Sequence, residues 1–186
     1  MTPNKKMKYA LHRVGFKRIG WLVCLLILVS GCGLKYSLSG AATTAKTIQV
    51  DLFYNNTDLG PANLGQNFTN KLKDYYQRNS SLKVVQENGE LLIEGTIVQY
   101  AVAPLAPVAG TSAAQPSQAA LTRLTIGVKA NYVDTKEPKN SFKDKTFSFY
   151  ADFPNDQNLI SIQESLENKI FDQIFLDIFN ATLANW

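Results

Sequence analysis

The 186-residue chain carries 19 Lys and Arg against 15 Asp and Glu, a net charge of +4 that is unevenly distributed. Six cations and no acid precede the first long apolar run, and they are Lys5, Lys6, Lys8, Arg13, Lys17 and Arg18. The other 13 cations are outnumbered by the 15 acids, so the rest of the chain, at about −2, has no basic face for a nucleic acid. Its length suits one domain.

Cysteine and histidine usage narrows the chemistry further. His12, Cys24 and Cys32 are the only residues of these two types, and all lie in the first 32 positions. The rest of the chain therefore cannot build a His/Cys zinc site or a His-based catalytic triad. We expect no cofactor and no enzymatic activity.

The N-terminal segment has the organisation of an export signal. An apolar run over residues 19–29 follows the cations. As a helix, eleven residues cover about 16 Å, roughly half of the ~30 Å hydrocarbon core of a membrane. A basic start, a short apolar core and small residues after it predict a secretory signal over residues 1–31.

The end of this signal resembles the lipobox of bacterial lipoproteins, where small residues precede an obligatory cysteine. It reads Leu28-Val29-Ser30-Gly31-Cys32. We expect Cys32 to receive a diacylglycerol thioether and, after cleavage, a further acyl chain on its amine. Two or three chains anchor a protein stably where one does not. The alternative is an ordinary buried cysteine. Residues 32–46 are predicted to form a lipidated tether.

Residues 47–53 alternate apolar and polar side chains, which predicts a half-buried strand with Ile48, Val50 and Leu52 on its inner face. A helix is predicted over residues 63–78, since apolar side chains recur every three or four positions. These are Leu64, Phe68, Leu72, Tyr75 and Tyr76. Stacking of the two tyrosines on a sugar is the alternative to core packing.

Residues 82–86 and 90–100 flank Asn88-Gly89, which predicts a type I′ hairpin between two strands. Residues 121–134 form a regular alternation with Leu124 to Tyr132 facing inward and Arg123, Thr125, Lys129 and Asn131 facing outward. A last strand is predicted over residues 142–153. The uncharged segment 103–120 is predicted to be a loop, either docked on a partner or a simple linker.

The longest element is a helix over residues 159–184, in which isoleucine or leucine recurs every four positions from Ile162 to Ile178. Phe171, Phe175 and Phe179 widen this stripe, as expected for a helix lying on a sheet. Glu164 and Glu167 are predicted to favour the helix dipole or to cap the helix start.

The order β-α-β-β-β-β-α predicts an α+β two-layer sandwich. A four- to five-stranded, mostly antiparallel sheet would carry two helices on one face and leave the other face polar. The first two strands, joined through a helix, are expected to lie parallel by a right-handed crossover.

Several short pieces of the sequence resemble the LptE family of lipopolysaccharide-assembly lipoproteins, over essentially the whole chain after the signal. They are Cys32-Gly33, Tyr36-Ser37-Leu38-Ser39-Gly40, Asn55-Asn56-Thr57, Glu87-Asn88-Gly89, and residues 92–97, 147–153 and 184–186. The resemblance assigns residues 47–186 to an LptE-like domain. It implies a non-enzymatic protein, lipid-anchored in the outer membrane, that plugs and helps assemble the LptD β-barrel for transport of lipopolysaccharide into the outer leaflet. Gly33 after the cysteine fits export to the outer membrane.

One departure from the family concerns ligand binding. Relatives place basic residues in the loop before the fourth strand and before the last helix, whereas residues 103–120 and 151–167 contain no Lys or Arg. Arg123, Lys136 and Lys139 are the nearest substitutes for contact with lipopolysaccharide. The alternative is that they form a solvated strand end and a charged turn. The competing function is another outer-membrane lipoprotein of α/β fold, such as a secretion-channel subunit or a regulator of cell-wall synthesis.

Overall fold

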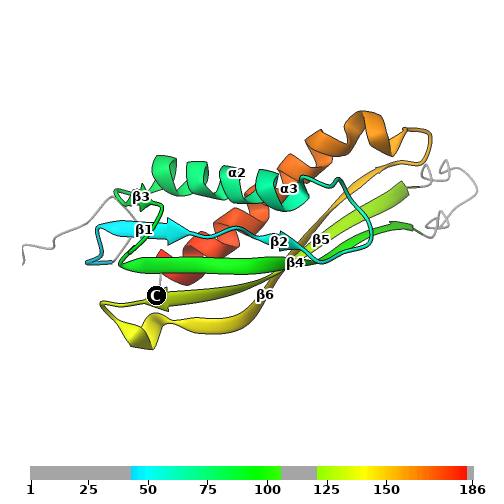
Figure 1. Ribbon diagram of the computed structural model, residues 1–186. Helices are drawn as coiled ribbons and strands as arrows, with labels where there is room; N and C mark the ends of the chain where they lie inside the picture. The colour runs from blue at the N-terminus through cyan, green and yellow to red at the C-terminus, as the bar shows by residue number, and fades with distance from the viewer. Residues whose placement is uncertain (1–42, 106–120, 184–186) are drawn as a thin grey trace, which may run out of the picture. The chain divides into compact units, whose positions relative to one another are not determined.

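The computed structural model describes residues 43–105 and 121–183 (Figure 1). The predicted signal peptide, Cys32 and most of segment 103–120 lie outside these residues. In chain order the elements are β1 (Thr47–Val50), β2 (Tyr54–Asn55), α2 (Leu64–Asn79), β3 (Lys83–Val85), β4 (Leu91–Pro104), β5 (Leu121–Asp134), the 3-10 turn η1 (Pro138–Asn140), β6 (Phe142–Pro154) and α3 (Leu159–Leu183).

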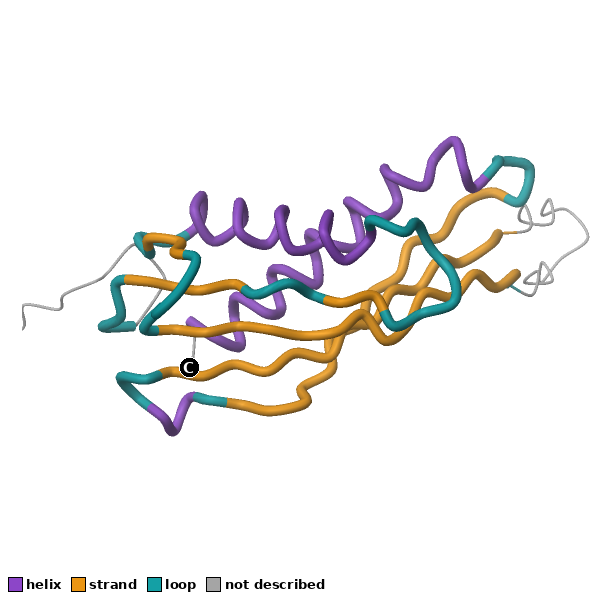
Figure 2. Tube along the Cα trace, in the orientation of Figure 1, coloured by secondary structure: helices purple, strands orange, loops and turns teal. Residues whose placement is uncertain are grey.

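The strands form one sheet of six, in the order β3-β1-β4-β5-β6, with β2 beside β4. β1 runs parallel to β3 and β4, and β2 parallel to β4, whereas β4, β5 and β6 are antiparallel neighbours. Both helices lie on one face, α2 against β1 to β3 and α3 against β5 and β6 (Figures 1 and 2). The predicted α+β two-layer fold and the parallel first pair are confirmed, and the sheet is mixed, with long antiparallel strands β4 to β6 and short parallel strands β1 to β3.

The predicted hairpin at Asn88-Gly89 is wrong, because β3 and β4 do not pair with each other. They flank β1 on opposite sides and run in the same direction, so residues 86–90 must cross β1. Asn88 has the positive φ of 56° that such a turn requires. A Cβ at Gly89 would lie 2.5 Å from the backbone N of Gln49, so only glycine fits this close crossing.

The predicted first strand is interrupted between β1 and β2. Val50 lies opposite Ile93 and Tyr54 opposite Thr96, so one extra residue is accommodated. The bulge turns Phe53 into the core and leaves Leu52, expected on the inner face, 39% exposed.

Three contacts hold this interruption in place. Thr69 of α2 accepts a hydrogen bond from Phe53 N at 2.9 Å and donates one to Gly65 O at 2.7 Å. The ring of Phe53 lies 2.4 Å from where a Cβ would sit at Gly95. The start of α2 and the middle of β4 are therefore fitted to the Phe53 backbone and ring.

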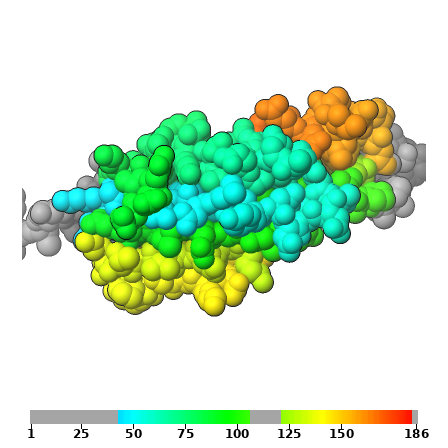
Figure 3. All heavy atoms as spheres, viewed as in Figure 1, coloured from blue at the N-terminus to red at the C-terminus, as the bar shows by residue number. Residues whose placement is uncertain are grey.

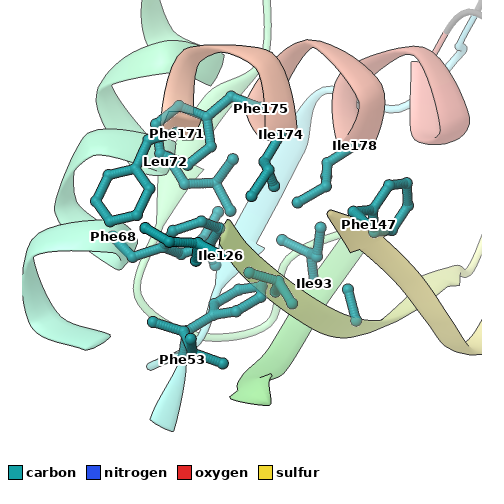
Figure 4. Packing of buried hydrophobic residues seen from close by; sticks show 14 of the residues in the cluster. Phe53, Phe68, Leu72, Ile93, Ile126, Phe147, Phe171, Ile174, Phe175 and Ile178 are labelled. Atoms are coloured by element: carbon teal, nitrogen blue, oxygen red, sulfur yellow. The ribbon is translucent and has the colours of Figure 1, made fainter. Parts of the chain in front are cut away.

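The core lies between the helices and the inner sheet face. Phe68 and Leu72 of α2 meet Phe171 and Phe175 of α3 above the sheet (Figure 4). The predicted α3 stripe is confirmed, since Leu166, Ile170, Phe171, Ile174, Phe175 and Ile178 are all buried. Tyr76 is buried as well, and its hydroxyl bonds to Thr182 Oγ1 at 2.8 Å, so the core-packing alternative is the correct one for this residue.

Glu167 does not act on the helix start as predicted. α3 begins at Leu159, and its first turn contains no acidic residue. The buried Glu167 carboxylate instead accepts hydrogen bonds from the Tyr100 hydroxyl at 3.0 Å and from Gln163 Nε2 at 2.9 Å. Burial and the neighbouring carboxylate raise the pKa of Tyr100 above its ordinary value. Glu167 thus joins α3 to β4.

Candidate functional site

The sheet face turned away from the helices is the main candidate surface. Along β5 the inward residues are buried from Leu124 to Tyr132, as predicted. The outward residues of three neighbouring strands are mostly polar and include Gln49, Asp51, Glu94, Thr96, Arg123, Thr125, Lys129 and Asn131, while the paired Leu92 and Val133 form an apolar end, with Val133 45% exposed. This face carries charges of both signs, so it suits a polar, hydrated counterpart better than an apolar one.

A recess of about 500 Å³ opens on this face between the end of β1 and the start of β2. It is lined by Asp51, Leu52, Tyr54, Glu94, Gly95, Thr96 and Asn131. In the space-filling view, the atoms of β1, β2 and the chain before α2 lie beside those of β4 (Figure 3). Tyr54 stands at the rim with 65% of its surface exposed.

The polar groups of the recess are already hydrogen-bonded within the face. Asp51 Oδ1 accepts from Gln49 Nε2 at 2.8 Å, and Glu94 Oε1 accepts from Asn131 Nδ2 at 3.1 Å. Over residues 43–105 and 121–183, no three His, Cys, Asp or Glu side chains are grouped so as to hold a metal ion. Because a carboxylate has several acceptor sites, Asp51 and Glu94 can still accept hydrogen bonds from a ligand.

Arg123 lies on the open face near the start of β5. Its guanidinium makes two hydrogen bonds to Asp152, at 2.7 and 2.9 Å, and lies 3.5 Å above the ring centre of Tyr150. The paired guanidinium lowers the pKa of Asp152, and the carboxylate raises that of Arg123. Arg123 is therefore held in one orientation by two neighbours from β6.

Lys136 and Lys139 lie beyond the other end of β5. Lys136 Nζ pairs with Glu90 Oε1 at 2.9 Å, and Lys139 Nζ with Glu137 Oε2 at 3.4 Å. At about 3.3 Å per residue, β5 separates Arg123 from this turn by roughly 35 Å. The structure therefore does not bring the three predicted ligand-binding residues together, and each is paired with a carboxylate.

Sequence reasoning missed the partners Tyr150, Asp152 and Glu90, and it missed the recess. The alternation of β6 places Tyr150 and Asp152 on one face, and this pattern was visible in the sequence. Their register against Arg123 was not, because 29 residues separate Arg123 from Asp152. The recess depends on the bulge at Phe53, which no local sequence pattern predicted.

These features together describe an α+β sandwich with an open, mostly polar sheet face, a class of domain that can bind a partner through that face. A model of the family LptE, lipopolysaccharide-assembly, matches residues 45–182. The chain belongs to the LptE family, a non-enzymatic family of assembly lipoproteins. No curated protein matches the chain. None of the helices among the described residues is long and apolar enough to cross a membrane.

Several solved structures are similar to the chain at low sequence identity. The hypothetical protein CT253 from Chlamydia trachomatis is 10% identical, with a TM-score of 0.50 over 76% of this chain and 99% of that chain. A minor lipoprotein from Acinetobacter baumannii is 16% identical, with a TM-score of 0.48 over 76% and 92%. Uncharacterized lipoprotein B from Nitrosomonas europaea is 15% identical, with a TM-score of 0.46 over 80% and 87%.

Proposed function

We propose that this protein is a non-enzymatic, lipid-anchored subunit of the outer membrane that occupies an LptD-like β-barrel, helps it assemble, and serves the transport of lipopolysaccharide into the outer leaflet. The observation that carries this proposal is the family match over residues 45–182, which spans nearly every described residue. Membership in a lipopolysaccharide-assembly family connects the chain to this process.

The open sheet face supports a position inside a barrel. The lumen of a large outer-membrane barrel is lined by polar side chains and water. The outward residues of β1, β4 and β5 are mostly polar and of mixed charge, and both helices leave this face uncovered. Such a surface can meet a polar wall through hydrogen bonds and water without burying an unpaired charge.

The lipid anchor is part of the same proposal. Lipidation of Cys32 would hold the chain at the periplasmic leaflet of the membrane. The residues between Cys32 and β1, fully extended, reach at most about 50 Å. This length lets a domain anchored at the leaflet enter a barrel in the same membrane.

The experiment is affinity purification of the full-length chain from native outer membrane, followed by mass spectrometry. We expect a large LptD-like barrel to be recovered with it, and a different outer-membrane lipoprotein carrying the same tag to recover none. Recovery of no barrel would overturn the proposal, and recovery of a ring of identical subunits would favour a secretion-channel subunit.

We also propose Arg123, Lys136 and Lys139 as contacts for lipopolysaccharide phosphates, at two separate places. Binding of labelled lipopolysaccharide to the purified protein tests each place. We expect weaker binding for Arg123→Met and for the double change of Lys136 and Lys139 to alanine. Lys143→Ala, which changes an exposed cation of β6, is the control. Equal binding by all variants would leave the three residues as strand-end and turn charges.

A further inference from the structure

The second half of β4 is an edge of the sheet. β2 pairs with Thr96 and Ile97 of β4, and the last bond on that side runs from Asn56 N to Ile97 O at 3.0 Å. Beyond this point, β5 remains paired with β4 as far as Pro104, but no other described strand pairs with residues 98–104. β4 accordingly continues past the end of β2 with no described strand on one side, and the chain between β2 and α2 approaches only its first residues, where Gly60 lies against the Tyr100 ring (Figure 1).

The direction of the backbone groups on this edge follows from the pairing with β5. Leu105 N donates to Leu121 O at 2.8 Å. Because neighbouring residues of a strand direct their groups to opposite sides, Ala101 and Ala103 face β5, and Tyr100 and Val102 face the open side. Pro104 belongs to the second set and lacks an N–H, as edge strands tolerate. The edge thus presents donors and acceptors about 7 Å apart, two residues at a time.

Two irregularities bound the edge. Ile97 pairs with Val128 and Gln99 with Gly127, so Val98 is bulged out of the ladder. Pro104 ends it on the other side. A regular run of five residues, 99–103, lies between them.

The side chains around this edge are uncharged and partly apolar. No charged residue occurs in residues 98–104, and Val98 and Val102 are 41% and 39% exposed. Tyr54 lies beside Thr96 at the end of β2. By contrast, the edge strand β6 carries Lys143, Asp144 and Lys145 and has a positive φ of 54° at Asp144, features that discourage strand pairing. β4 lacks this protection by charge.

We propose that residues 98–104 of β4 bind an extended, uncharged segment of the barrel partner as an added strand. The regular spacing of the exposed backbone groups matches only another extended chain. The identity of the partner rests on the proposed function. A second copy of this chain fits less well. If two copies paired antiparallel with Ala101 at the centre, the bulged Val98 of one copy would lie opposite Pro104 of the other, which has no N–H to donate.

Val102 permits a matched test on the full-length protein in the outer membrane. Val102→Pro keeps an apolar side chain and removes an N–H that β5 does not use, whereas Val102→Ala keeps the N–H and shortens the side chain. We expect barrel recovery to fall about tenfold for Val102→Pro, because a hydrogen bond is lost and the ring occupies the approach of the added strand. Val102→Ala should recover nearly the wild-type amount.

A cross-link at the same position keeps the test decisive if the proline variant folds poorly. The chain has no cysteine after Cys32, so Val102→Cys gives one attachment point for a short thiol-reactive photo-cross-linker. An adduct with the barrel supports the inference. An adduct of two copies, no adduct while the barrel co-purifies, or full recovery by Val102→Pro overturns it and leaves the proposed function standing. Absence of the barrel from the wild-type sample overturns both.

Discussion

Ile170 lies in the middle of α3 with none of its surface exposed, and replacing it with aspartate should unfold the domain. Removing the buried side chain forfeits about 1.5–3 kcal/mol of transfer free energy. A carboxylate in the same place adds a desolvation cost of several kcal/mol or takes up a proton. The sum approaches the roughly 5–15 kcal/mol that stabilises a typical domain.

The matched control is Ile160→Asp on the same helix. Ile160 is 81% exposed and is the second residue of α3, where a negative charge favours the helix dipole. We expect its free energy of unfolding to change by less than about 0.5 kcal/mol. Urea titration of the purified protein, followed by circular dichroism, measures both variants.

A graded series separates lost burial from added charge. Ile170→Val should cost about 0.5–1.5 kcal/mol and Ile170→Ala about 2–5 kcal/mol. If Ile170→Asp and Ile160→Asp unfold at the same urea concentration as the wild type, Ile170 is not in the core and the packing of α3 on the sheet is wrong.

Three further predictions test other parts of the structure. Thr69→Val should lower the free energy of unfolding by about 1–3 kcal/mol, because it leaves Phe53 N–H buried without an acceptor. Thr69→Ser keeps the hydroxyl and should lower the free energy of unfolding by less. A larger decrease for serine than for valine would contradict this. Asp152→Asn should cost at most about 1 kcal/mol at pH 7, since the pair with Arg123 is partly exposed. Because Arg123 lowers the pKa of Asp152, that contribution is fully present above the ordinary pKa of 3.8 and is lost as the pH falls from there through the lowered pKa, so titrations at pH 7 and pH 2.5 should show a smaller difference at the lower pH. Replacing residues 106–118 with a short Gly-Ser link should change the free energy of unfolding by less than about 1 kcal/mol, because the ends of β4 and β5 are joined by the hydrogen bond from Leu105 N to Leu121 O. If the segment docks on the barrel, recovery of the barrel should also fall.

Local periodicity was sufficient to predict the helices and the long strands. The four-residue spacing from Leu166 to Ile178 indicated the buried face of α3, and all its members are buried. The alternation along β5 indicated which residues face away from the helices. These patterns report which side of an element is covered, and that information is contained in the element itself.

Pairing partners were not predictable in the same way. Asn88-Gly89 correctly indicated a tight turn, but the sequence did not reveal that β1 lies between the two strands it joins. Glu167 was predicted to act on the helix start, whereas its carboxylate accepts a hydrogen bond from Tyr100, which lies 67 residues earlier in the chain.

The candidate site was predicted only as a polar face. The outward positions of Arg123 and Lys129 followed from alternation, whereas the ion pair with Asp152 required the register of β5 against β6. The recess required the extra residue between β1 and β2, a consequence of how Phe53 packs against Gly95 and α2. Contacts that close over long sequence distances therefore determine the details of this surface.

The most direct test of the central proposal is the mass of the intact complex that this protein forms in the outer membrane. Native mass spectrometry of the tagged protein, released in mild detergent, measures this mass. We expect one copy of this chain with one copy of a large LptD-like barrel. A mass equal to the chain alone, or to several copies of it without a barrel, would contradict the proposed function.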